Sequence, residues 1–288
     1  MSRVLEELLH LLMIEAVGDD LFVGESQDLG WGRVYGGQVL GQALSAAERT
    51  VDPNRLVHSL HAYFLRPGDP SQPIEYRVER TRDGRSFTTR RIRAEQAGRP
   101  IFFMAASFQI QETGLEHQDA MPEVPDPDEL ISSNDLILQH AEHLPAAVVD
   151  WAMMDFPIEM RPVTVGDPMN PVPSEPVQQV WLRAESDLPD GPALHRYLLA
   201  YASDLMLLDT ALLPHGTNYW QGGLQMASID HAMWFHRDLR MDDWLLYAMD
   251  SPSAAGARGL VRGKFFDRNG VLVASVAQEG LVRPVNRN

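Results

Sequence analysis

One order of elements occurs twice along this chain of 288 residues, and this repetition limits its architecture more than any other feature. In the first copy, a segment rich in small and apolar residues, 37–48, reads as a helix that other backbone approaches closely. Strand-like segments separated by Gly, Pro and Asp turns follow it, at 56–65, 74–80, 86–95 and 101–109. This spacing predicts a helix followed by an antiparallel meander.

The second copy begins with an apolar helix predicted at 193–213, and strands are predicted at 225–236, 244–249, 256–266 and 271–278. The anchor between the copies is the dipeptide His61-Ala62, which matches His231-Ala232 at an offset of 170 residues. Identity between the halves is almost nil, so the repeat rests on pattern. The predicted fold class is α+β, with two copies of a long helix against an antiparallel sheet.

The proline-rich, acidic segment 121–129 separates the two copies. We therefore predict an N-terminal half at 1–115, a connecting region at 116–150 and a C-terminal half at 151–288. A helix is predicted at 133–144, and strands at 158–165 and 177–184 open the second half. Residues 1–20 read as an amphipathic helix with no signal-peptide pattern. No run approaches the roughly 20 apolar residues of a membrane span, so we expect a cytoplasmic protein.

The composition excludes several kinds of chemistry. With no cysteine, the chain has no disulfide framework, thiolate zinc site or cysteine nucleophile. A formal net charge of −16 opposes nonspecific binding to nucleic acid or anionic lipid. The G-x-S-x-G elbow of serine hydrolases and the phosphate-binding P-loop are absent. A serine-hydrolase nucleophile of the elbow type is therefore excluded.

Two acids interrupt the apolar segment 197–213, namely Asp204 and Asp209. At helical spacing Asp204 lies among apolar side chains, where an ionised carboxylate is costly unless it is hydrogen-bonded or its pKa shifts. Such an environment produces a general base. The alternative is an aspartate bonded to nearby backbone. The residues leave both interpretations open for Asp204 and favour the structural one for Asp209, which is nearer the helix end.

Two polar residues on the predicted strands are further candidates. Alternation places Ser228 on the same strand face as Asp230, and His231 on the opposite face. In the last strand Gln278 ends an apolar row, and its amide offers both a donor and an acceptor that can hold a water molecule. Taken singly, Ser228 and Gln278 are more typical of ordinary polar residues at strand ends.

Five long stretches make the sequence similar to the acyl-CoA thioesterase II family over essentially its whole length. They are 34–44 (VYGGQVLGQAL), 56–69 (LVHSLHAYFLRPGD), 201–205 (YASDL), 229–237 (IDHAMWFHR) and 272–280 (LVASVAQEG). The resemblance implies a tandem, or double, hot dog, in which each half is a long central helix wrapped by an antiparallel sheet. It also implies that Asp204, Ser228 and Gln278 jointly activate a water molecule. The family's hydroxyl is more commonly threonine, and the serine here retains the donor.

The function implied is hydrolysis of medium- to long-chain fatty acyl-CoA to a free acid and CoA, with no acyl-enzyme, cofactor or metal. The first half has no acid between residues 36 and 47, and it has His58 and Phe108 at the repeat offset from Ser228 and Gln278. One active site per chain is therefore expected. The resemblance further implies a homo-oligomer, either a homodimer or a homotetramer. Because CoA is an anion, any CoA site must rely on local arginines. The candidates are Arg85, Arg90, Arg91, Arg93, Arg258 and Arg262, although each taken singly is more typical of a solvated charge on a strand face.

Two other functions remain open from the sequence. The first is a hot-dog hydratase or dehydratase that acts on enoyl thioesters through Asp230 and His231. The second is a catalytically silent acyl-CoA-binding protein. The hydratase would not release thiol, and the silent binder leaves a buried Asp204 without a role.

Overall fold

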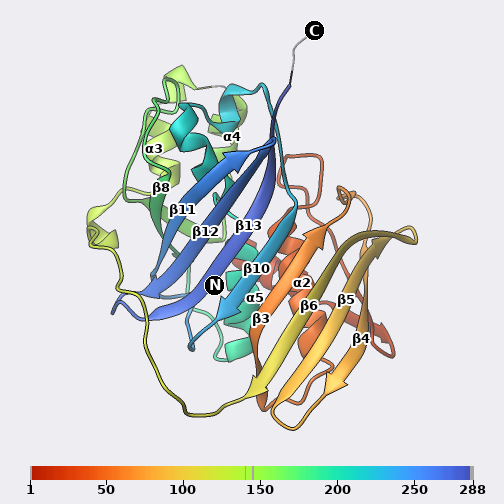
Figure 1. The fold of residues 1–288 in the computed structure, drawn as a ribbon. Helices are drawn as coiled ribbons and strands as arrows, with labels where there is room; N and C mark the ends of the chain where they lie inside the picture. The colour runs from red at the N-terminus through yellow and green to blue at the C-terminus, as the bar shows by residue number, and fades with distance from the viewer. Residues whose placement is uncertain (1, 140, 145, 286–288) are drawn as a thin grey trace.

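Two central helices pack against each other inside one long antiparallel sheet (Figure 1). The computed structural model describes residues 2–139, 141–144 and 146–285. The central helices are α2 (Gly36–Glu48) and α5 (Pro192–Ala202). Nearly every residue of both helices is buried, which explains their apolar composition. No helix in the described part of the chain is long and apolar enough to cross a membrane.

The first half begins with helix α1 (Arg3–Leu12), whose apolar side is buried. The predicted helix over 1–20 is therefore too long, because the chain turns at Met13 into a hairpin that sequence reasoning missed; Met1 lies outside the described residues. The strands of this half are β1 (Glu15–Gly18), β2 (Leu21–Gly24), β3 (Arg55–Phe64), β4 (Ile74–Asp83), β5 (Phe87–Gln96) and β6 (Arg99–Ile110).

The connecting region contains short helices: η1 (Pro127–Glu129), α3 (Ser133–Gln139), η2 (Ala141–His143) and α4 (Ala146–Ala152). The predicted helix 133–144 therefore corresponds to α3 and η2, with His140 outside the described residues. The strands of the second half are β7 (Ile158–Pro162), β8 (Val177–Ala184), β9 (Leu224–Ser228), β10 (Asp230–Phe235), β11 (Leu245–Ala255), β12 (Arg258–Asp267) and β13 (Leu272–Pro284). Short 3-10 helices η3 (Leu208–His215) and η4 (Tyr219–Gln221) precede β9.

The sheet order is β1-β2-β4-β5-β6-β3-β10-β13-β12-β11-β8-β7, with β9 pairing to β13. The order is symmetric about its centre, where β3 of the first half pairs with β10 of the second half. Each of these two strands is the innermost strand of its half. The repeat and the expected tandem hot-dog fold are confirmed. Each half contributes one helix and one end of the continuous sheet.

The expected repeat anchor is wrong by one residue. His61 points outward and is exposed, whereas His231 is fully buried on the inner face. Leu60 and Ala62, on either side of His61, are the residues that share the inner face with His231, so the two copies match at an odd offset rather than at 170. Side chains alternate between faces along a strand, so an error of one residue exchanges the inner and outer sets. The matching His-Ala dipeptides are coincidental.

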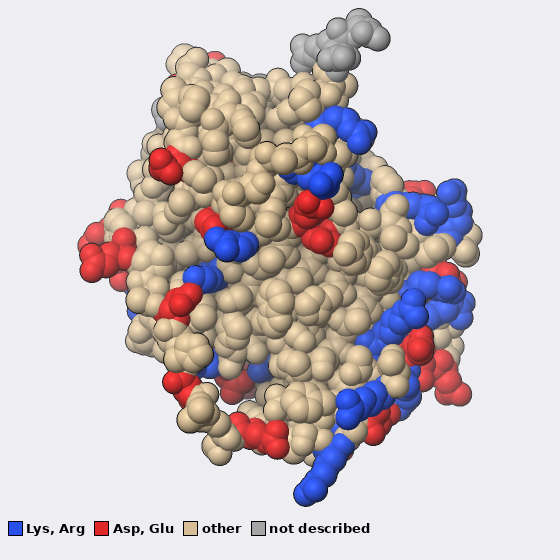
Figure 2. All heavy atoms as spheres, viewed as in Figure 1, with Lys and Arg blue, Asp and Glu red and all other residues tan. Residues whose placement is uncertain are grey.

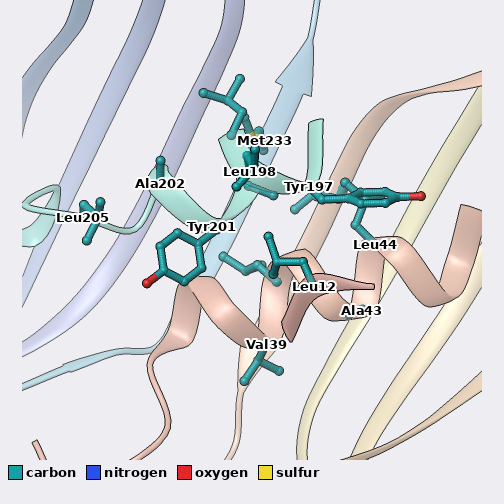
Figure 3. Close-up of a cluster of buried hydrophobic side chains, with 14 of the residues drawn as sticks. Leu12, Val39, Ala43, Leu44, Tyr197, Leu198, Tyr201, Ala202, Leu205 and Met233 are labelled. Atoms are coloured by element: carbon teal, nitrogen blue, oxygen red, sulfur yellow. The ribbon is translucent and has the colours of Figure 1, made fainter. Parts of the chain in front are cut away.

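Small residues on α2 allow the close approach of α5. A Cβ atom on Gly37 would lie 2.2 Å from the backbone oxygen of Tyr201, and one on Gly41 would lie 3.1 Å from that of Tyr197. The helices therefore run antiparallel, with the start of α2 beside the end of α5. Around this contact, side chains from α1, α2, α5 and β10 form one apolar core (Figure 3).

Candidate active site

A break in the second central helix positions Asp204. The predicted helix 193–213 is not continuous, because α5 ends at Ala202 and the chain resumes as η3 only at Leu208. Met206, between α5 and η3, adopts a left-handed φ of 58°, so the chain does not continue as a helix from one to the other. Two buried tyrosines bind the carbonyls this leaves: Tyr35 Oη donates to the Tyr201 oxygen over 2.9 Å, and Tyr247 Oη donates to the Ser203 oxygen over 2.7 Å. Asp204 thus lies on a tightly held turn rather than on a helix face.

An irregularity between β9 and β10 turns Ser228 inward. Ser228 pairs with Gly280 and Ala232 pairs with Ala277. The chain therefore advances by four residues along β9 and β10 while β13 advances by three. The extra residue shifts the alternation at Ile229, as a β-bulge does. Ser228 therefore lies on the inner face with His231, and the predicted assignment of these two residues to opposite faces is wrong.

The three residues singled out in the sequence form one hydrogen-bonded group. Ser228 Oγ donates to Asp204 Oδ1 over 3.1 Å, and Gln278 Nε2 donates to Ser228 Oγ over 2.9 Å. Gln278 is on the inner face of β13, as its alternation with Val276 predicted. Three separate elements thus bring a carboxylate, a hydroxyl and an amide together.

Burial raises the pKa of Asp204 to about 6. Hydrogen bonds from Ser228, Gln278 and the backbone N–H of Gly37, together with the charge of Arg33, act in the opposite direction. The Gly37 bond comes from the first turn of α2, where free N–H groups favour an anion. A Cβ atom on Gly36 would lie 2.6 Å from Asp204 Oδ2, so this position requires glycine. The carboxylate is held ionised near neutral pH but remains basic enough to accept a proton.

Asp204, Ser228 and Gln278 line a cavity of about 660 Å³. Its walls come from both halves and from the connecting region, and most of them are apolar, including Phe64, Leu136, Phe156, Met160 and Met226. The volume lies within the range of small-molecule pockets, roughly 300–1,000 Å³. A reactive polar group on the wall of an apolar cavity suits a substrate with a long apolar part.

Asp209 lines the same cavity, although its sequence position favoured a structural role. Desolvation alone raises its pKa to about 6, and no hydrogen bond to its carboxylate is found among the described residues. The bend after α5 moves Asp209 from the expected helix end to the cavity wall. No sequence signal indicated this placement, because it depends on where α5 breaks.

The arginines expected to bind an anionic substrate lie elsewhere. Arg90 is buried and donates to Thr50 and Asp83, so it is structural. Others form ion pairs on the sheet surface, among them Arg93 with Glu95, Arg258 with Glu279 and Arg262 with Asp250. None of the six candidates lines the cavity.

The cavity wall instead contains Arg33 and Arg66, which the sequence reasoning missed. Their side chains donate to the backbone oxygens of Met226 and Pro100. Neither forms an ion pair with a described residue, so both charges remain available to a substrate anion.

The pair expected of a hydratase is divided between the two faces of the sheet. Asp230 faces outward, where its Oδ1 accepts the backbone N–H of Glu279 over 2.6 Å. His231 is fully buried on the inner face and hydrogen-bonds to Ser203 and Gln278. Neither residue lines the cavity, so they do not converge on a common substrate atom.

The first half does contain an acid at the position that matches Asp204. It is Glu48, which lies one residue beyond the segment 36–47, where no acid was found. Counted from the helix starts, Glu48 at the end of α2 corresponds to Asp204 after α5. Burial raises its pKa, while a hydrogen bond from Tyr197 lowers it. Glu48 does not line the cavity. His58 bonds to Ser107 over 2.8 Å and Phe108 is fully buried, so no second polar group forms around Glu48 from these positions.

No group of three or more His, Asp or Glu side chains in the described ranges is arranged to hold a metal ion. The side chains that line the cavity offer acid–base chemistry at Asp204. A hydroxyl, an amide and backbone N–H groups surround this carboxylate, and a water molecule bound there would be oriented toward the cavity.

Two family models match the chain. One, described as acyl-CoA thioesterase, matches residues 150–281, and the other, described as the acyl-CoA thioesterase N-terminal domain, matches residues 26–109. The sequence is 41% identical over 283 residues to acyl-CoA thioesterase 2 of Haemophilus influenzae, covering 98% of this chain and 99% of that protein. It is 43% identical over 282 residues to acyl-coenzyme A thioesterase 8 of Homo sapiens, covering 95% and 88%.

A solved structure is similar over the same length. The crystal structure of an acyl-CoA thioesterase II from Mycobacterium marinum matches with a TM-score of 0.80 and 43% sequence identity, covering 98% of this chain and 100% of that one. The resemblance thus extends over both halves of the sheet and both central helices.

Proposed function

The chain belongs to the acyl-CoA thioesterase II family and is an acyl-CoA thioesterase, and from this premise we propose that Asp204, Ser228 and Gln278 activate the water that attacks the thioester. The observation that carries the proposal is a carboxylate with a pKa of about 6 on the cavity wall, bonded to a hydroxyl that an amide also contacts. A base is most effective when its pKa lies near the working pH.

The reaction follows from this arrangement. Asp204 accepts a proton from the water, and the resulting hydroxide forms a bond to the thioester carbonyl carbon. The tetrahedral intermediate collapses with cleavage of the carbon–sulfur bond, and the CoA thiolate takes up the proton held by Asp204. Ser228 and Gln278 hold the water at the required angle. Direct attack by water forms no acyl-enzyme.

The start of α2 supports stabilisation of the oxyanion. Gly36 lines the cavity, and its lack of a side chain leaves the first-turn N–H groups accessible beside Asp204. Backbone N–H groups at a helix start are suited to a developing negative charge. The acyl carbonyl is thus proposed to lie between Asp204 and the start of α2, with its chain in the apolar cavity. Arg33 and Arg66 are proposed to attract the anionic CoA.

The proposed substrates are medium- to long-chain acyl-CoAs, because a cavity of about 660 Å³ with apolar walls accommodates many methylene groups. The test is release of CoA thiol from saturated acyl-CoAs of increasing length by the wild type and by Asp209→Leu. The wild type is expected to prefer longer chains to acetyl-CoA. At pH 8, Asp209→Leu should raise kcat/KM for palmitoyl-CoA about tenfold, because contact with methylenes no longer desolvates an unpaired carboxylate, a cost of about 1–3 kcal/mol.

Butyryl-CoA is the internal control, since a short chain buries less of the cavity wall and its kcat/KM should change less. A flat response to chain length in both proteins would contradict the proposed substrate class. Equal changes for butyryl-CoA and palmitoyl-CoA would contradict the role of Asp209 alone. Absence of thiol release from every substrate would favour a silent binder or a hydratase.

Residues 1–115 are proposed to form a half that binds substrate and 151–288 the half that carries catalysis, with 116–150 connecting them and one active site per chain. We also propose that the chain forms homo-oligomers. Support comes from the outward face of the central strands, where Tyr63 stacks on Phe103 and Trp234 contacts His61. Few charged groups cover the middle of this face in Figure 2. Light scattering should give at least twice the chain mass of 32.3 kDa; a monomer mass at micromolar concentration would contradict this.

A further inference from the structure

The amide of Gln278 works in only one of its two orientations. Its Nε2 donates to Ser228 Oγ over 2.9 Å, and its Oε1 faces His231 Nδ1 at 2.6 Å. A rotation of 180° would exchange these ends and place the carbonyl oxygen toward Ser228 and Asp204. The side chain would then no longer donate to the catalytic group. Whatever decides the orientation of this amide therefore controls the site.

His231 has one N–H to offer. The imidazole is fully buried, and desolvation lowers its pKa to about 4, so the ring is neutral at physiological pH. A carbonyl oxygen can only accept a hydrogen bond, so the ring proton must be on Nδ1 for the 2.6 Å contact to form. If the amide turned over, its NH₂ group would face that N–H, and two donors would be opposed.

Ser203 is the hydrogen-bond partner of the other ring nitrogen of His231. Its Oγ lies 2.9 Å from His231 Nε2 and is fully enclosed. With the proton on Nδ1, Nε2 is an acceptor and Ser203 donates to it. The alternative acceptor for this hydroxyl is the backbone oxygen of Ala200, also at 2.9 Å. A bond donated by Ser203 to Nε2 is compatible only with the tautomer that Gln278 requires, because Nε2 then carries no proton.

We propose that Ser203 and His231 are positioning residues that hold the Gln278 amide in its working orientation. Every bond in the resulting series points the same way, from Ser203 through His231, Gln278 and Ser228 to Asp204. Aligned donors polarise one another and favour the ionised carboxylate at the end of the series. Neither Ser203 nor His231 lines the cavity, so both act without touching substrate. The proposal rests on the proposed role of Gln278.

Three substitutions at His231 distinguish a role in orienting the Gln278 amide from a role in packing the core. The amide nitrogen of Asn occupies the place of Nδ1, whereas that of Gln occupies the place of Nε2, and Leu has no donor. His231→Leu and His231→Gln are expected to lower kcat at least about tenfold with KM changed less than threefold. His231→Asn should restore most of the lost activity.

The pH profile gives a signature that packing alone does not produce. The groups acting on Asp204 are Ser228, Gln278, the Gly37 N–H and Arg33, and the phenols of Tyr35 and Tyr247 also face it. Because the Gln278 bond lowers the pKa of Asp204, losing it should move the acid limb of kcat to higher pH in the Leu and Gln variants. In His231→Asn the limb should return toward its wild-type position.

Ser203→Ala is the second variant, since it leaves the imidazole in place and removes the bond to Nε2 together with the contact to the Ala200 oxygen. It should shift the acid limb in the same direction by a smaller amount. Equal losses in the Asn, Gln and Leu variants, with unshifted acid limbs, would overturn the proposal and assign His231 to packing. Failure of the proposed function itself looks different, because wild-type activity would then survive Gln278→Ala.

Discussion

Asp204→Asn is expected to abolish thiol release and, at neutral pH, to stabilise the fold. Loss of a general base costs about 10²–10⁴ in rate. The same carboxylate is desolvated in the folded state, where its pKa is about 6 rather than the usual 3.8. Asparagine retains an oxygen that accepts the bond from Ser228 without burying a charge. The free energy of unfolding should therefore rise by about 3 kcal/mol, from about 1.4 kcal/mol for each unit of pKa.

The size of this effect depends on pH. The folded state holds its proton on Asp204 more tightly than the unfolded state, so this group lowers wild-type stability as pH rises from 3.8 to about 6. The gain in Asp204→Asn should be near zero at pH 3.5 and complete above pH 7. Wild-type kcat/KM should fall below about pH 6, because the base is then protonated.

Denaturant unfolding at several pH values and initial rates of thiol release measure both effects. Asp19→Asn is the control, since Asp19 is exposed and its removal should alter neither quantity. Retained activity in Asp204→Asn would reject the base assignment. A lower stability at pH 7 would mean that the hydrogen bonds to the carboxylate outweigh its desolvation.

Gly37→Ala is expected to produce the largest loss of stability. A methyl group there would lie 2.2 Å from the Tyr201 backbone oxygen and 2.5 Å from the Tyr35 ring. A backbone oxygen in the packed end of α5 does not rotate away as a flexible side chain does, so the helices must separate. Overpacking typically costs about 1–3 kcal/mol, and we expect a loss at or above the upper end. Activity should fall as well, because Gly37 N–H binds Asp204.

Gly18→Ala is the matched control for this change. Its nearest contact would be Leu21 Cβ at 3.7 Å, which is ordinary packing distance. Thermal unfolding of both variants tests the prediction, with the control expected within about 0.5 kcal/mol of wild type. Similar midpoints for Gly37→Ala and wild type would show that the two helices tolerate a wider separation.

The element order was predictable because local patterns encode it. Strands β3 to β6 and β10 to β13 have alternating apolar and polar residues and clear turn signals. These patterns can be recognised in each segment without knowledge of the rest of the chain. The hairpin of β1 and β2 was missed because it follows an amphipathic helix with little punctuation at Met13. The break after α5 was missed because the segment is apolar on both sides of Ser203, and the tyrosines that bind its carbonyls are distant in sequence.

The sequence by itself determined the repeated helix and meander, the absence of cysteine chemistry, and the identity of Asp204, Ser228 and Gln278 as a group through family resemblance. Only the tertiary structure decided that Ser228 faces inward, that Asp209 reaches the cavity, and that Arg33 and Arg66 rather than the surface arginines do so. The physical reason is that a bulge, a helix break and a cavity wall depend on contacts between distant segments. The local periodicity of a sequence predicts whether a residue is buried, but it does not predict which residue from a distant segment will contact it.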